Sequence, residues 1–163
     1  MNKDRSNFNK LMQSQIKKRD TYDAGVETLF DLRNSLWDTI RSLRDELSRD
    51  DFTAIPFINA DGYHSKTIAY SLWHVFRIED IVAHTLIRGD EQVFFRRDYQ
   101  TRIGSPIITT GNELVKQEIA DFSKQLNLEE LYAYLSAVRQ TTRLEIVAQS
   151  GYPPICANCA PLR

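Results

Sequence analysis

The 163-residue chain has no long apolar run and few cysteines, glycines and prolines, with two, six and five of each. A membrane-spanning helix needs about 20 consecutive apolar residues, and the N-terminal stretch also lacks the apolar segment of a signal peptide. Both cysteines, Cys156 and Cys159, lie near the end of the chain, which is unlike the disulfide framework of a secreted protein. The sequence therefore predicts a cytoplasmic protein with no membrane-spanning segment.

An excess of charge of one sign is also missing, because 21 lysines and arginines nearly balance 22 aspartates and glutamates. A near-neutral chain has no overall field that would draw it to nucleic acid or to an anionic membrane surface. We therefore expect no nucleic-acid or membrane partner, and any partner must be recognised by a local site.

Helical periodicity is what the sequence does contain, and no segment shows the sustained alternation of a strand. The prediction is an all-α antiparallel helical bundle. A polar arm or weak helix is expected at 1–20, the bundle at 21–149, and an irregular tail at 150–163. Four helices are expected within the bundle. They run from Tyr22 to about Ser48, from about Thr67 to Arg88, from the region of Thr110 to Leu126, and from about Leu128 to near Gly151.

Residue types at the predicted helix ends support these assignments. Ser65 or Thr67 is suited to cap the second helix, and Gly89 to end it. Thr110 with Glu113 and Asn127 with Glu130 match capping boxes for the third and fourth helices. The inner faces are then expected to carry Val115, Ile119, Phe122 and Leu126 on the third helix, and Leu131, Leu135, Val138 and Thr142 on the fourth.

The second predicted helix carries His74 beside an apolar stripe. This stripe is expected to face the core, although Glu79 interrupts it; it consists of Ile68, Leu72, Val75, Glu79, Val82 and Leu86. A polar group at the edge of a core needs a partner, because an unsatisfied one costs about 1–3 kcal/mol. That partner is either a metal ion or another protein group, and the residues alone favour a hydrogen-bonded structural imidazole.

The other two histidines do not complete a site with His74. His84 lies ten residues further along the helix, which is about 15 Å and too far for one metal ion. We expect His84 to be a solvated residue at the helix end and His64 to lie in a surface loop.

The run "TIAYSLWHVFRIEDIVAHTLIRGDEQVF", followed by "TGNELVKQEIADFSKQLNLEELYAYLSAVRQTT", resembles the DinB-like (DinB/YfiT) superfamily of four-helix bundles. The resemblance spans roughly residues 22–148, and its most specific piece is Trp73-His74 followed by Glu79-Asp80. It implies a DinB-like fold, a homodimer, and His74 as one of three histidines that bind nickel or zinc. It also implies a thiol-dependent transferase or isomerase that acts on a small-molecule or thiol substrate.

The other two histidines of the family form an HxxxH pair on the last helix, and this sequence contains no HxxxH. The resemblance therefore implies an incomplete metal site and a bundle that lacks its last helix. Glu79, Asp80 or the tail thiols remain alternative ligands. No spacing in the sequence indicates a catalytic or cofactor-binding residue.

The tail "SGYPPICANCAPLR" is unlike the family's continuation, since it holds three prolines and no helical periodicity. We expect a non-native tail left by a frameshift or early stop, with a natural short variant as the alternative. Its C-x-x-C is isolated, without the second ligand pair of a structural zinc or the βαβ context of a redox motif.

Two functions of different classes follow from the sequence. The first is a DinB-like, divalent-metal-binding, thiol-dependent transferase or a relative of one, whose missing ligands are lost or supplied by a partner chain. The second is a non-catalytic helical bundle that acts through self-association. A homodimer is expected in either case, most simply through the first two helices of the bundle.

Overall fold

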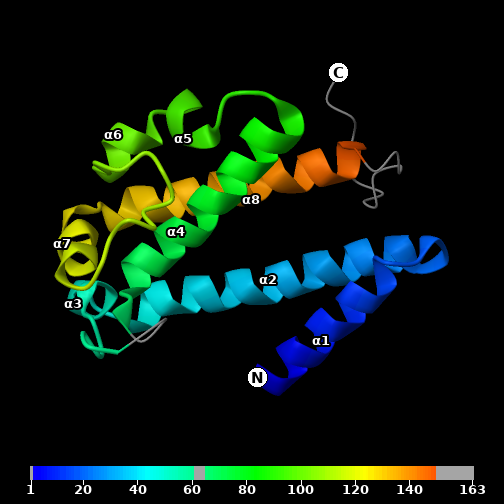
Figure 1. Cartoon of the computed structure of the whole chain (residues 1–163), viewed down its shortest axis with the longest axis horizontal. Helices are drawn as coiled ribbons and strands as arrows, with labels where there is room; N and C mark the ends of the chain where they lie inside the picture. Colours follow the sequence, from blue (N-terminus) through cyan, green and yellow to red (C-terminus); the bar gives the residue numbers. More distant parts are fainter. Residues whose placement is uncertain (1, 61–64, 150–163) are drawn as a thin grey trace. The chain divides into compact units, whose positions relative to one another are not determined.

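The computed structural model describes residues 2–60 and 65–149. Every regular element in these ranges is helical, which confirms the all-α fold class. The elements, shown in Figure 1, are α1 (Asn2–Gln15), η1 (Arg19–Thr21), α2 (Tyr22–Glu46), α3 (Arg49–Thr53), α4 (Ile68–Asp80), η3 (Ile81–Arg88), α5 (Val93–Arg96), α6 (Tyr99–Ile103), α7 (Gln117–Gln125) and α8 (Leu128–Gln149). No helix in these ranges is both long enough and apolar enough to cross a bilayer.

The chain divides into two compact units, Met1–Ser48 and Arg49–Arg163. In the first unit α1 and α2 form a helical hairpin (Figure 1). Gly25 allows the end of α1 to approach α2, because a Cβ atom at this position would lie 2.7 Å from a side-chain carbon of Ile16 and 2.8 Å from its main-chain nitrogen. The sequence segment expected to be an arm or a weak helix thus contains a helix packed on its neighbour.

The second unit is built around α4 and α8, which pack against each other (Figure 1). The predicted start of α8 is confirmed, since the Asn127 side chain accepts hydrogen bonds from the main-chain N–H groups of Glu129 and Glu130. The predicted inner face of α8 is buried as well; its members are Leu131, Leu135, Val138 and Thr142.

The predicted start of the third helix is wrong. Helix α7 begins at Gln117, several residues after the expected capping box at Thr110. The Glu113 carboxylate instead accepts a hydrogen bond from the hydroxyl of Thr109, and Gly111 between them has φ +73°. These residues therefore form a loop, and Val115 before α7 is exposed. The rest of the predicted inner face, Ile119, Phe122 and Leu126, is buried.

Both predicted ends of the second helix are confirmed. The side chain of Thr67 accepts a hydrogen bond from the main-chain N–H of Tyr70 at the start of α4. At the other end the helix passes into η3, a π-helix, and stops at Gly89, which has φ +72°. The wider π turn was not expected from the sequence, and such turns are often found at functional sites.

The predicted core face of the second helix is wrong for most of its length. Val75 is 50% exposed and Leu86 is 71% exposed, and Val82 is exposed too. The buried face consists instead of Ala69, Tyr70, Leu72, Trp73, Phe76, Arg77, Asp80, Ala83 and His84. Counting apolar residues selected the wrong face because a charged pair, Arg77 and Asp80, is buried together in this core.

Candidate functional site

A loop segment, residues 108–111, lies along α4, and we call it the strap. Its four successive main-chain carbonyls accept hydrogen bonds from side chains on one face of α4. The Tyr70 hydroxyl donates to Gly111 at 3.0 Å, His74 Nδ1 to Thr110 at 2.6 Å, and the Arg77 guanidinium to Thr109 at 3.4 Å and to Ile108 at 2.5 Å. The strap therefore runs antiparallel to α4, and three α4 side chains hold it by its backbone.

His74 lies in the middle of this row, half-buried at the edge of the core. Its ring stacks on the Tyr70 ring, with 5.3 Å between the centroids and 13° between the planes. Because a carbonyl oxygen can only accept a hydrogen bond, Nδ1 must carry the proton of the contact with Thr110. In the neutral ring the lone pair is then on Nε2, and Nε2 has no hydrogen-bond partner among the described residues.

Tyr70, which supports the His74 ring, is itself held as a neutral phenol. Burial and the negative charge of Glu113 raise the pKa of Tyr70 above its usual value. The hydroxyl can therefore act as the hydrogen-bond donor to the strap throughout the physiological pH range. An aromatic support and a main-chain acceptor together restrict the orientation of the imidazole.

Of the predicted ligands, His74 has a ring nitrogen, Nδ1, that is hydrogen-bonded to a main-chain carbonyl. Residues 2–60 and 65–149 contain no group of three histidine, cysteine, aspartate or glutamate side chains that could hold a metal ion. Asp80, an alternative ligand, is fully buried, and its carboxylate accepts hydrogen bonds from Tyr134 and from the start of α5. His64, Cys156 and Cys159 lie outside the described residues.

A buried polar network continues from the strap into the core. Arg77 and Asp80, both fully buried, form a salt bridge at 3.3 Å, and the Tyr134 hydroxyl of α8 donates to Asp80 at 2.9 Å. Burial and the negative charge of Asp80 raise the pKa of Tyr134 well above its usual range, so this phenol stays neutral and remains a donor. The Arg77 guanidinium also donates to Gln92 at 2.9 Å. This network was not predicted from the sequence.

Asp80 links α4 to the start of α5. Its two carboxylate oxygens accept hydrogen bonds from the main-chain N–H groups of Val93 and Phe94, each at 2.9 Å. The Arg77 guanidinium lies over the Phe94 ring, 4.0 Å from its centroid. One carboxylate thus satisfies two N–H groups that the first turn of a helix leaves without intrahelical partners. The spacing of Arg77 and Asp80, three residues apart on one helix, was the sequence signal for their pairing.

The prediction of a solvated His84 is wrong, because this residue is 0% exposed. The chain reverses at Gly89, and the next residue, Asp90, then lies against the imidazole, with 2.6 Å between Nδ1 and Oδ1. On the other side, Nε2 is 3.9 Å from Oδ1 of Asp80 and has no hydrogen-bond partner among the described residues. Burial of His84 depends on the π turn and on this reversal, neither of which periodicity can predict.

Asp90 lies between the buried imidazole of His84 and two partly exposed arginines, Arg88 and Arg96. Burial opposes ionisation of this carboxyl, but the hydrogen bond and electrostatic attraction of His84, with the nearby guanidinium groups of Arg88 and Arg96, outweigh it and lower the pKa of Asp90. The two arginines lie 3.2 Å and 3.6 Å from Oδ2. The Asp90 carboxylate is therefore stabilised in its charged form in the folded chain.

This pKa shift predicts a loss of stability in acid. A carboxyl whose pKa is lowered by folding contributes stability above its unfolded pKa, about 3.9, and loses it as the pH falls through the folded pKa. We expect Asp90→Asn to weaken the pH dependence of the unfolding free energy below about pH 4. Urea denaturation between about pH 5 and pH 3 measures it, with exposed Asp121→Asn as the control. Equal pH dependence in the two variants would contradict this interpretation.

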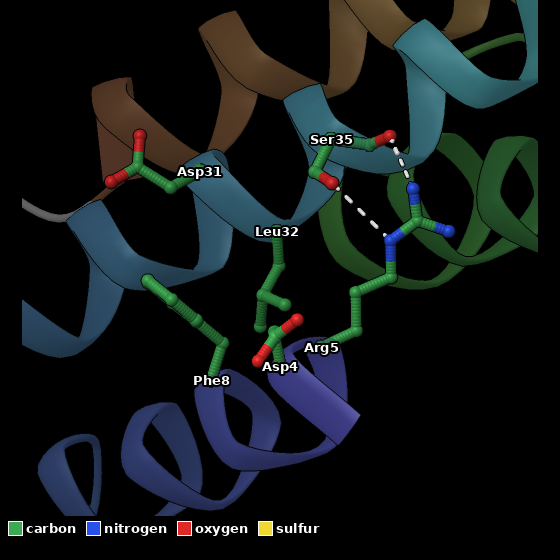
Figure 2. Close-up of a pocket in the computed structure, with 6 residues that line it drawn as sticks. All are labelled: Asp4, Arg5, Phe8, Asp31, Leu32 and Ser35. Carbon is green, nitrogen blue, oxygen red and sulfur yellow. Dashed lines mark hydrogen bonds between the residues drawn. The ribbon is translucent and has the colours of Figure 1, made fainter. Parts of the chain in front are cut away.

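A separate groove of about 470 Å³ lies within the first unit, between α1 and α2. Figure 2 shows Arg5 reaching from α1 to the side-chain and main-chain oxygens of Ser35 on α2, with Phe8 and Leu32 on facing helices. Arg5 also hydrogen-bonds the Thr39 hydroxyl. Phe8 and both carboxylates that line the groove, Asp4 and Asp31, are exposed. These contacts attach α1 to α2 and present no buried polar group to a ligand.

Comparison of the sequence with protein-family models and with curated proteins gives no match.

Proposed function

We propose that this chain is a DinB-like helical-bundle protein in which Nε2 of His74 is one ligand of a divalent metal ion, nickel or zinc. The observation that supports this proposal is the hydrogen bond from Nδ1 to the Thr110 carbonyl. Histidines that bind metals usually donate their second ring N–H to a carboxylate, a main-chain carbonyl or water, and this bond fixes the tautomer and the ring orientation. The Nδ1 atom of His74 makes a hydrogen bond of this kind.

His74 is proposed as one of three ligands, and residues 2–60 and 65–149 contain no group of three histidine, cysteine, aspartate or glutamate side chains that could hold the ion. The proposal therefore includes further ligands from outside these residues or from a partner chain. A bound divalent metal would deprotonate and activate a coordinated thiol, which is the chemistry of the proposed thiol-dependent transfer. In that chemistry, this chain's own residues would orient the imidazole. Tyr70 stacks on the ring, and the Thr110 carbonyl of the strap binds Nδ1.

A second candidate, a non-catalytic bundle acting through self-association, is favoured by an exposed apolar row on α4 and η3. Its members recur at intervals of three and four residues, as in a helix that pairs with another: Val75, Ile78, Val82 and Leu86. Contiguous exposed apolar surface commonly marks an interaction site. This row belongs to the second of the two helices proposed to form the homodimer.

One experiment separates the two candidates. Wild-type chain and His74→Ala are purified without a histidine tag, their metal content is measured by elemental mass spectrometry, and their mass is measured by light scattering. The proposal predicts stoichiometric nickel or zinc in the wild type that is lost in His74→Ala, because removal of the imidazole removes a ligand. His84→Gln is the matched control, since the ring of His84 is buried against Asp90, and it should retain the metal.

If the wild type and His74→Ala are both dimers and neither contains metal, the metal proposal is contradicted and the second candidate is supported. A monomer of about 19 kDa, close to the chain mass of 18.9 kDa, would contradict self-association. Metal that persists in His74→Ala would show that the ion binds elsewhere.

A further inference from the structure

We infer that Gly111 is a positioning residue for His74: by allowing the strap to lie close against α4, it determines which imidazole nitrogen carries the lone pair. This inference deepens the proposed function and rests on it, since the lone pair on Nε2 is the proposed metal ligand.

Gly111 is the point at which the strap comes closest to α4. A Cβ atom at this position would lie 2.7 Å from Cζ3 of Trp73 and 3.3 Å from Cε2 of Tyr70. Trp73 is fully buried and packs edge-on against Phe122, with 4.7 Å between the ring centroids, so it cannot move aside cheaply. The backbone of Gly111 also has φ +73°, a conformation that other residues adopt with strain.

The two strap carbonyls next to this contact are the acceptors for Tyr70 and His74. Gly111 accepts from the Tyr70 hydroxyl, and Thr110 accepts from Nδ1 of His74. A side chain at position 111 would push the strap outward and lengthen both hydrogen bonds. Without the Thr110 acceptor, nothing in the described structure holds the proton of a neutral imidazole on Nδ1, and the proton can move to Nε2. The lone pair would then no longer be fixed on the nitrogen proposed to bind metal.

Gly111→Ala tests the inference, and Gly89→Ala is its matched control. Gly89 has nearly the same backbone angle, φ +72°, but a Cβ atom there would meet nothing within 4 Å. Both variants therefore carry the same backbone strain, and only Gly111→Ala adds the steric clash with Trp73. The readout is the tautomer of His74 in the metal-free full-length chain, measured from the ¹⁵N shifts of the imidazole by NMR; His74→Gln identifies the signal.

We expect wild type and Gly89→Ala to hold His74 with its proton on Nδ1, and Gly111→Ala to show a substantial fraction with the proton on Nε2. The same three proteins are then titrated with nickel(II) chloride. Gly111→Ala should bind about 10–100-fold more weakly than Gly89→Ala, the usual loss when a group that orients a ligand is disturbed. Should Gly111→Ala fail to fold by circular dichroism, Tyr70→Phe replaces it; this variant removes one strap hydrogen bond, keeps the ring stack and should shift the tautomer in the same direction.

The outcomes separate the inference from the proposed function. A His74 tautomer and a nickel affinity in Gly111→Ala that equal those of Gly89→Ala would overturn the inference and leave the proposed function standing. A tautomer shift in Gly111→Ala, with no nickel bound through His74 in the wild type, would support the role of the strap and overturn the proposed metal site.

Discussion

Replacing Asp80 with asparagine is expected to lower the free energy of unfolding by about 3–5 kcal/mol, the usual cost of removing one partner of a buried ion pair. The loss is large because one carboxylate serves four donors: the Arg77 guanidinium, the Tyr134 hydroxyl and the first two N–H groups of α5. Asparagine has nearly the same shape, but its NH₂ group would face donors and leave the arginine charge uncompensated.

Urea denaturation followed by circular dichroism measures the effect of Asp80→Asn. The matched control is Asp121→Asn on α7, whose carboxylate is 58% exposed and lies 3.9 Å from Lys124. Surface changes of that kind usually alter stability by less than about 0.5 kcal/mol. A loss no larger for Asp80→Asn than for the control would contradict the description of Asp80 as the centre of a buried network.

Arg77→Met is expected to cost a similar amount, about 3–5 kcal/mol, and in addition to release the strap. Methionine retains much of the apolar stem of the side chain but removes every hydrogen bond to Asp80, Gln92 and the first two strap carbonyls. The free energy of unfolding should fall, and limited proteolysis should cut between about residues 104 and 116 faster than in the wild type.

The control for Arg77→Met is Arg102→Met. Arg102 is half-exposed, pairs with Glu130 at 2.5 Å and lies over the Tyr99 ring, so its loss should cost no more than about 1 kcal/mol. The double variant Arg77→Met with Asp80→Asn should lose less free energy of unfolding than the sum of the two single variants. In the double variant both charges are removed, so no charge stays buried without its partner. Additive losses would mean that the two residues do not act as a pair.

Local helix signals were predictable from the sequence because they depend on a few neighbouring residues. Thr67, Gly89 and Asn127 mark helix ends through their own side chain or backbone angle, and the structure has each of them in that role. The inner face of α8 was predictable for a similar reason, since its buried positions are nearly all apolar and follow a simple helical spacing.

The buried face of α4 was not predictable in the same way. Arg77, Asp80 and His84 are buried because groups from distant parts of the chain satisfy them, including the strap carbonyls, the α5 backbone and Tyr134 of α8. Hydropathy ranks these residues as solvent-facing, so the prediction assigned the core to a stripe whose members Val75, Val82 and Leu86 are exposed.

The predicted site was incomplete for the same reason. Trp73-His74 indicated the helix that carries the candidate site, but the main-chain partner of the imidazole, Thr110, is 36 residues away and was predicted to be a helix cap. The strap is a backbone feature, and its one sequence signal is Gly111, whose φ of +73° and close contact with Trp73 suit only glycine.

The most direct test of the central claim is the ¹⁵N NMR spectrum of the His74 imidazole in the full-length chain, recorded without metal and with added zinc, which is diamagnetic. We expect a ring protonated on Nδ1 before zinc is added, and a zinc-dependent shift that is largest at Nε2 while Nδ1 keeps its proton. A ring protonated on Nε2 in the free chain, or a spectrum of His74 that zinc leaves unchanged, would contradict it.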